Sequence, residues 1–199
     1  MYLLNYSFLS FISLIIGLLI GITIHEFTHA WVAFKFGDPT PYHAKRVSLN
    51  PFVHLDPLGT IFLFLVGFGW GRPVPINPFY LSKFEEVIVA LSGPFSNLAL
   101  AFFLTLPLRF GLALPLPLLE ILNFVIFINI FLCIFNLLPI PPLDGSKLLK
   151  AFLPEDLAQQ FESFGIFLLI LLVLFDNVIP IFSFAAKIAF RIYTIFRGF

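Results

Sequence analysis

The chain of 199 residues is far more apolar than a soluble domain, with 60% hydrophobic residues, 11% charged residues and a mean hydropathy of +1.03. Soluble domains average roughly half apolar and about a quarter charged residues, so the composition excludes that class and indicates an all-α, multi-pass membrane protein. Lys+Arg and Asp+Glu both number 11, and the resulting net charge of zero excludes a basic surface for nucleic acid.

Apolar runs long enough to cross a bilayer divide the chain. A transmembrane helix needs about 20 such residues. We therefore expect about five transmembrane helices within a single membrane domain over residues 1–199. The last of them carries Lys187 and Arg191 on one face, so it either crosses the bilayer with snorkelling ends or lies along the interface. The expected spans are 8–36, 87–110, 116–138, 161–176 and 179–197.

A shorter apolar run at 58–71 lies between the first two spans and is interrupted by glycines. A run of about 13 residues is too short to cross the bilayer as a helix. Irregular backbone is tolerated at membrane depth only where protein shelters it or where it lines a wet cavity. We therefore expect a re-entrant segment here, with a β-hairpin as one conformation for it.

The basic residues indicate which side of the membrane each loop occupies. If 58–71 does not cross, Arg109 lies alone on one side, and a full crossing would divide the basic residues between both faces. By the positive-inside rule, the basic side is cytoplasmic and the N-terminus lies outside, in a prokaryotic cell (inner) membrane. The residues on the cytoplasmic side are then Lys35, Lys45, Arg46, Arg72, Lys83, Lys147 and Lys150.

A metal-binding pattern, His25-Glu26-Phe27-Thr28-His29, lies near the inner end of the first span. Helical spacing of four places both imidazoles on one face, about one turn apart, where they can bind one metal ion. Glu26 lies about 100° around the helix from His25, so it is free to act as a general base on a metal-bound water. Ionisable side chains inside a membrane helix usually mark a functional site.

Two histidines leave such a site incomplete, because catalytic zinc usually has three protein ligands. Asp144 follows the 116–138 span in a stretch where Pro139, Pro141 and Pro142 prevent a regular helix. From the residues alone, five candidates for the third ligand stay open: Asp144, His54, His43, Asp56 and Glu85.

These patterns together resemble the site-2 protease family of intramembrane zinc metalloproteases, peptidase family M50, in a short form without a stretch for PDZ or CBS domains. The main match pairs the HEFTH motif with the Asn136-x-x-Pro-x-Pro-x-Leu-Asp144-Gly145 motif. Ser146 stands where many relatives have a second glycine. Three smaller matches are Gly93-Pro94-x-x-Asn97, Gly37-Asp38-Pro39-Thr40 and His54-x-Asp56-Pro57-Leu58-Gly59-Thr60.

The resemblance implies one zinc ion per chain, bound by His25, His29 and Asp144, with Glu26 as the catalytic acid/base. It also implies that Asn136 and the proline-rich stretch help to hold the substrate. We assign Asn97 and His54 to the same substrate-binding role. A hydrogen bond from His54 to its neighbour Asp56 is the alternative.

The expected activity is hydrolysis of a peptide bond in or near a transmembrane segment of another protein, as in regulated intramembrane proteolysis. The implied partners are this substrate and the lipid bilayer, and the sequence indicates no oligomeric state. A metal-ion transporter is the first alternative, but it predicts an internal repeat that the sequence lacks. The second is a non-catalytic relative that binds membrane helices.

Overall fold

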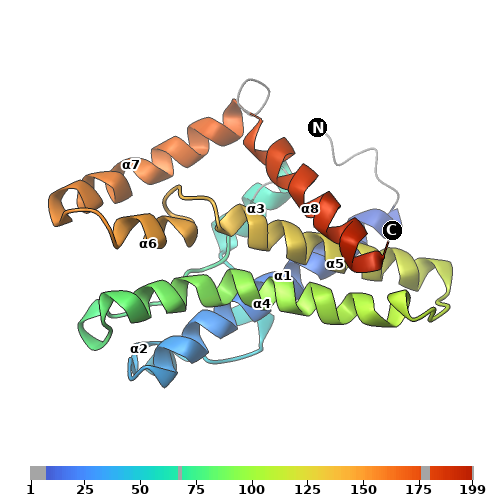
Figure 1. The fold of residues 1–199 in the computed structure, drawn as a ribbon, viewed down its shortest axis with the longest axis horizontal. Coiled ribbons are helices and arrows are strands. Elements are labelled where there is room, and N and C mark those ends of the chain that lie inside the picture. The colour runs from blue at the N-terminus through green and yellow to red at the C-terminus, as the bar shows by residue number, and fades with distance from the viewer. Residues whose placement is uncertain (1–7, 67–68, 176–179, 199) are drawn as a thin grey trace.

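The structure, a computed structural model, describes residues 8–66, 69–175 and 180–198, which are built from helices and their connections (Figure 1). Three long helices form the centre: α1 (Phe8–Lys35), α4 (Lys83–Arg109) and α5 (Leu116–Asn136). Each of the three packs against the other two. All three are long and apolar enough to cross a membrane, which confirms the class of membrane protein.

Small residues let α1 approach α5 closely. A Cβ atom added at Gly21 would lie 2.6 Å from the end of the Leu132 side chain, so a larger residue there would have to displace that side chain. Small residues at such helix contacts are typical of membrane proteins, where packing rather than the hydrophobic effect drives association. A buried cluster of Ala101, Ile126, Ile130 and Ala189 joins α4 and α5 to the C-terminal helix α8 (Ile181–Arg197).

The helix α4 begins at Lys83, earlier than the expected residue 87. Ser82 and Glu85 form a capping box, in which the Ser82 side chain accepts from the Glu85 backbone N–H and the Glu85 side chain accepts from that of Ser82. This cap satisfies backbone N–H groups at the first turn of α4. The helix therefore begins before the apolar run that was used to predict its start. The helix then continues through Pro94 and Pro107.

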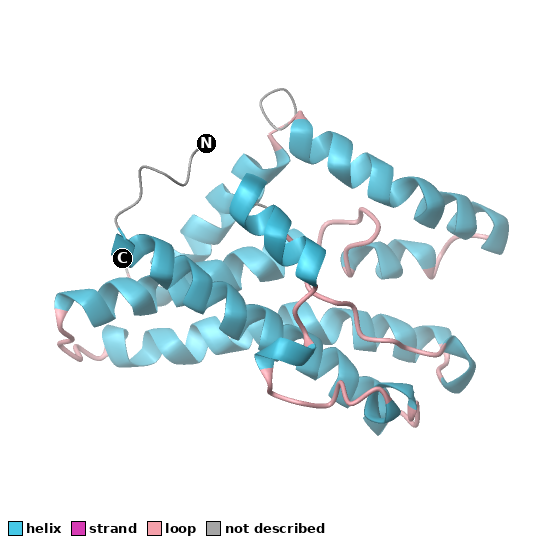
Figure 2. Ribbon diagram, turned by 180° about the vertical axis from the view of Figure 1, so that it is seen from behind, coloured by secondary structure: helices cyan, strands magenta, loops and turns pink. Residues whose placement is uncertain are grey.

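The expected β-hairpin at 58–71 is wrong for the part described, because Pro57–Val66 forms the helix α3. Asp56 starts this helix: its side chain accepts from the Gly59 backbone N–H at 2.7 Å, and Pro57 fits the first helical position. No strand forms among the described residues (Figure 2). One isolated antiparallel bridge joins Leu55 to Gly71.

The short elements around the centre are α2 (Thr40–His43), α6 (Gly145–Lys150) and two single 3₁₀ turns, Pro51–Val53 and Pro78–Tyr80. The helix α7 (Glu155–Leu174) follows α6 and lies away from the centre in Figure 1. Lys147 and Lys150 of α6 both contact the Glu162 carboxylate of α7 at 2.8 Å.

The fourth and fifth spans correspond to α7 and α8, and they stay predictions. Among the described residues, α1, α4 and α5 meet the length and hydropathy expected of a span. The helix α8 has 17 residues and packs along α5 and α4, with Ala185 and Ala189 fully buried. Residues 176–179, which the expected spans include in part, lie outside the described residues.

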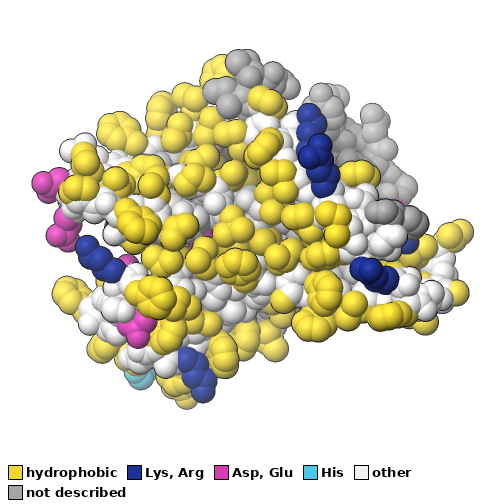
Figure 3. Space-filling view, viewed as in Figure 1, with side chains coloured by type: hydrophobic (Ala, Val, Ile, Leu, Met, Phe, Trp, Pro, Cys, Tyr) yellow, Lys and Arg dark blue, Asp and Glu magenta, His cyan; other side chains and the backbone are white. Residues whose placement is uncertain are grey.

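Hydrophobic side chains cover most of the visible surface in Figure 3. Acidic and basic side chains gather at the left-hand end of that view, where α4 begins and α6 lies, and further basic side chains follow α8. A surface that is apolar along the helices and charged at one end is the pattern expected of a protein embedded in a bilayer.

Candidate metal centre

Two histidines of α1 face the interior between the three central helices. His25 and His29 are one helical turn apart and only 7% and 6% exposed. Their Nε2 atoms lie 3.0 Å from each other. The spacing in the sequence therefore produces the expected pair of imidazoles on one buried face.

Asp144 reaches the same point from the end of α5. The helix ends at Asn136, and short turns through the proline-rich stretch, such as the bond from Leu143 N–H to the Ile140 carbonyl, return the chain toward α1. The Asp144 Oδ2 atom lies 2.9 Å from His25 Nε2 and 3.2 Å from His29 Nε2. Among the described residues, these three form the one group of His, Cys, Asp or Glu side chains close enough to share a metal ion.

Hydrogen bonds on the far side of each ring determine where the protons lie. A backbone carbonyl only accepts, so the 2.7 Å contact between His29 Nδ1 and the Val89 carbonyl requires a proton on Nδ1. His25 Nδ1 makes a 2.7 Å bond to Asn97 Oδ1, whose amide nitrogen in turn donates to the Asn129 side chain. With Nδ1 protonated in this way, a neutral ring presents the lone pair of Nε2 to the Asp144 carboxylate.

Three electron-pair donors then converge, which is unfavourable unless a proton or a metal cation lies among them. Zinc bonds of about 2.0–2.1 Å in tetrahedral geometry would set neighbouring ligand atoms about 3.3 Å apart. The observed separations of 2.9, 3.0 and 3.2 Å are close to that value. Two imidazoles and one carboxylate also suit zinc chemically, so the residues fit this metal.

Gly93 of α4 makes room for the centre. A Cβ atom at this position would lie 2.6 Å from His29 Cε1 and 2.8 Å from His25 Nε2, and closer still to His29 Nε2. Real Cβ contacts are longer than this. The glycine is therefore required for α4 to pass directly beside both imidazoles.

Glu26 lies beside the three converging side chains and is not one of them. Its side chain is 15% exposed, and its Oε2 atom lies 3.9 Å from Nη2 of Arg46, which belongs to the loop after α2. A Cβ atom at Gly71 would lie 3.6 Å from Glu26 Oε1, so the chain that returns from α3 passes next to this carboxylate. Glu26 therefore lies next to the three-residue group and outside it.

The remaining predicted site residues lie in different surroundings. Asn97 is fully buried and bonded to His25, so the structure places it behind the His25 ring and not on an exposed surface. His54 is also fully buried and lies outside the three-residue group, and its Nε2 bonds to the Ser48 carbonyl at 2.6 Å rather than to Asp56. Burial lowers the pKa of His54. Asn136, at the end of α5, donates to the Leu132 carbonyl.

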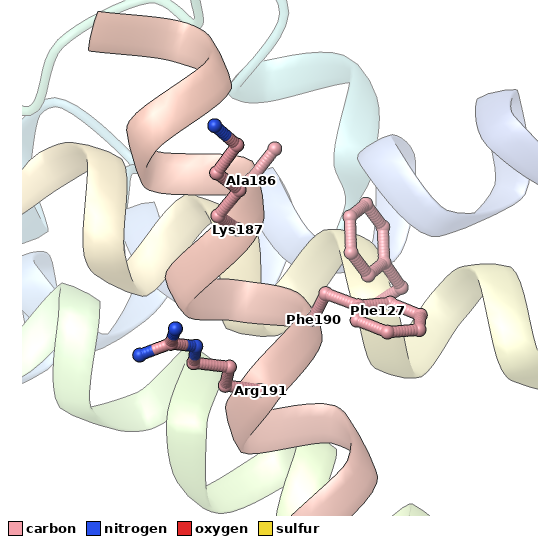
Figure 4. Close-up of a pocket in the computed structure, with 5 residues that line it drawn as sticks. All are labelled: Phe127, Ala186, Lys187, Phe190 and Arg191. Carbon is pink, nitrogen blue, oxygen red and sulfur yellow. The ribbon is translucent and has the colours of Figure 1, made fainter.

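A pocket of about 440 Å³ lies elsewhere, between α5 and α8. Figure 4 shows Lys187 and Arg191 on one side of α8 and the rings of Phe127 and Phe190 on the other. None of the predicted site residues lines this pocket. The candidate centre therefore lies among packed helices and not in the pocket.

Comparison with known proteins identifies the family. The model of peptidase family M50 matches residues 111–175. YwhC of Bacillus subtilis is 41% identical over 175 residues, which cover 81% of this chain and 79% of YwhC. The chain belongs to peptidase family M50. The resemblance to the site-2 proteases is therefore confirmed, and the chain is assigned as a membrane-bound metalloprotease.

Two further relatives come from other prokaryotes. Rip2 of Mycobacterium tuberculosis is 34% identical over 176 residues, which cover 83% of this chain and 67% of Rip2. MJ0611 of Methanocaldococcus jannaschii is 39% identical over 149 residues, or 73% of each protein. All three relatives carry provisional names as zinc metalloproteases. No solved structure matches the chain.

Gly93 and Arg46 were not predicted to lie at the candidate centre, and Asn97 was predicted there in a different role, that of binding substrate. Gly93 and Asn97 were recognised as parts of a motif, but their contacts with the two histidines depend on how α4 packs against α1. Arg46 was counted only as a cytoplasmic charge. Arg46 is buried whereas the adjacent Lys45 is exposed, and burial in an irregular loop has no periodic signal in the sequence.

Proposed function

We propose that the chain is an intramembrane zinc endopeptidase that hydrolyses a peptide bond in or beside a transmembrane segment of another protein. The observation that carries the proposal is the convergence of His25, His29 and Asp144 between helices apolar enough to span a bilayer. Six residues separate His29 from the end of α1, which corresponds to about 9 Å of helix. The centre therefore lies below the membrane surface in this proposal.

One zinc ion per chain would be held by the three side chains, leaving a fourth position open. When bound, zinc lowers the pKa of a coordinated water to about 7 and polarises the scissile carbonyl. Glu26 takes a proton from the attacking water and delivers it to the leaving nitrogen. Asn97 and the Val89 carbonyl keep both imidazoles in the tautomer that leaves Nε2 free for the metal.

A substrate helix must unwind before cleavage, because its carbonyls are held in hydrogen bonds within the helix. Two irregular segments lie near the centre: the proline-rich stretch after Asn136 and the chain that returns from α3 at Gly71. We assign both, with Asn136, to binding the unwound substrate through backbone hydrogen bonds. His54 supports the second segment, since its carbonyl accepts from the Arg72 N–H.

The orientation we propose places the N-terminus outside and the centre toward the cytoplasm. The basic residues near the inner ends of α1 and α4 and in α6 support it through the positive-inside rule. The relatives YwhC, Rip2 and MJ0611, from two bacteria and an archaeon, support a prokaryotic cell membrane.

The test uses two labelled transmembrane peptides that differ only in helix stability. One has an alanine- and leucine-rich core, and the other replaces two central alanines by glycine. Each glycine weakens a helix by about 1 kcal/mol, and about 1.4 kcal/mol is tenfold in rate, so the second peptide should be cleaved about 10- to 30-fold faster. Cleavage is measured by mass spectrometry after reconstitution of both components in lipid vesicles.

Addition of a zinc chelator should stop cleavage of both peptides, and zinc should restore it. Equal cleavage rates for the two peptides would contradict the requirement for unwinding. The absence of cleavage by the zinc-loaded protein would contradict the proposed activity and favour the non-catalytic, helix-binding alternative.

A further inference from the structure

Arg46 is an unusual residue because it is buried outside the helices of the centre. It is 4% exposed, although it lies in an irregular loop between α2 and the first 3₁₀ turn. A buried guanidinium is stable only where hydrogen bonds and an opposite charge compensate it. Arg46 has both contacts at a single nitrogen, Nη2, which donates to the Arg72 carbonyl and lies 3.9 Å from Glu26 Oε2, whereas its buried Nε atom has no hydrogen-bond partner in the part of the chain that the structure describes.

The loop that carries Arg46 is tied to the chain beside Glu26 by several bonds. The Ser48 N–H donates to the Arg46 carbonyl at 2.9 Å, and His54 Nε2 donates to the Ser48 carbonyl at 2.6 Å. The His54 carbonyl in turn accepts from the Arg72 N–H at 2.7 Å. The guanidinium therefore closes a ring of contacts that fixes its own position relative to Glu26.

Glu26 has few other restraints in the part of the chain that the structure describes. No ion pair other than that with Arg46 is formed by its carboxylate there. The neighbouring ligands His25 and His29 are held by bonds to α4, and those bonds do not involve Glu26. A side chain with three rotatable bonds needs such a contact to keep its carboxylate in one place.

We propose that Arg46 is the positioning residue for Glu26. Its positive charge, 3.9 Å from Oε2, attracts this oxygen and so favours one orientation of the carboxylate, which leaves Oε1 for proton transfer. Its second contact, with the Arg72 carbonyl, sets the chain that returns from α3 at a fixed distance from the same carboxylate. This inference rests on the proposed role of Glu26 as the general base.

The first experiment tests the contact without any activity. Thermal midpoints are measured by tryptophan fluorescence, for which the chain has two tryptophans, on the zinc-loaded wild type, Arg46→Met, Glu26→Gln and the double variant. If the two side chains interact, Arg46→Met should lower the midpoint by at most half as much in the Glu26→Gln background as in the wild type. Equal decreases in both backgrounds would overturn the contact.

The second experiment tests the role, using the glycine-containing peptide and zinc-loaded protein. Arg46→Met should lower kcat about 10- to 100-fold, with KM within about twofold and zinc content unchanged. Arg46→Lys keeps the positive charge but not the planar guanidinium that places Nη2, so it should recover part of kcat. The matched control, Lys45→Met, removes the adjacent exposed charge and should match the wild type.

Several results would overturn the positioning role. These are a wild-type kcat in Arg46→Met, an effect on KM alone, and an equal loss in Lys45→Met. If Arg46→Met does not fold, a kcat in Arg46→Lys equal to the wild type would overturn the need for the guanidinium group at this position. A wild type that cleaves no peptide would instead disprove the proposed function, while the thermal experiment would still decide whether the contact exists.

Discussion

Replacing Glu26 by Gln is expected to reduce kcat on the glycine-containing peptide at least about 10³-fold while zinc stays bound. Glutamine has nearly the same shape as glutamate but cannot accept the proton, and positioned acid–base groups typically contribute about 10²–10⁴-fold. Zinc should be retained because Glu26 is not among the three converging side chains. Peptide cleavage by mass spectrometry and zinc by elemental analysis give the two readouts on the same preparation.

Glu155→Gln is the matched control for this variant. Glu155 is an exposed acid at the start of α7, so the substitution makes the same change of charge away from the centre. It should leave kcat within about twofold of the wild type, as expected of a surface substitution. Cleavage by Glu26→Gln at the wild-type rate would contradict the assignment of the general base, and loss of zinc would indicate that Glu26 is a ligand.

Substituting Gly93 by Ala is expected to remove most of the bound zinc, and cleavage with it. The added methyl would lie 2.8 Å from His25 Nε2 and 2.6 Å from His29 Cε1, too close for either ring to keep its position. Because cores are close-packed, the strain is relieved by moving α4 or the imidazoles, which breaks the ligand geometry. Zinc content should fall at least fivefold under conditions that saturate the wild type.

Gly17→Ala provides the comparison, since Gly17 also lies in a helix interface. There, a Cβ atom would meet no atom closer than 3.4 Å, which is ordinary contact. Alanine favours helix over glycine by about 1 kcal/mol, so Gly17→Ala should keep its zinc and its thermal midpoint. Equal zinc content in the two variants would contradict the requirement for glycine at position 93.

The pair of histidines in α1 was predictable from the sequence because their relative position depends on helix geometry alone. Any helix that includes His25 and His29 places them one turn apart, whatever surrounds it. Predicting that Asp144 lies near these two histidines needed a further assumption, namely that residues 58–71 do not cross the membrane. That assumption makes α1 and α5 parallel, so that both bring their C-terminal ends to the same side, and the structure brings Asp144 within 3.2 Å of both histidines.

Other features depend on packing that no sequence pattern specifies. The start of α3 has a clear signal, Asp56 followed by Pro57, but the glycines of 58–71 favoured a hairpin in our interpretation. Those glycines instead permit close approach, since a Cβ atom at Gly59 would collide with the Trp70 carbonyl. The burial of Arg46 against Glu26 likewise results from contacts between segments far apart in the chain.

The measurement that tests the central claim most directly is the zinc content per chain of the purified protein, compared with His25→Ala and Asp144→Ala. It needs no substrate, and it asks whether α1 and the segment after α5 share one metal ion. We expect about one zinc per chain in the wild type and at least a fivefold loss in both folded variants, because two remaining ligands bind weakly. Full zinc content in Asp144→Ala, or none in the folded wild type, would contradict the account.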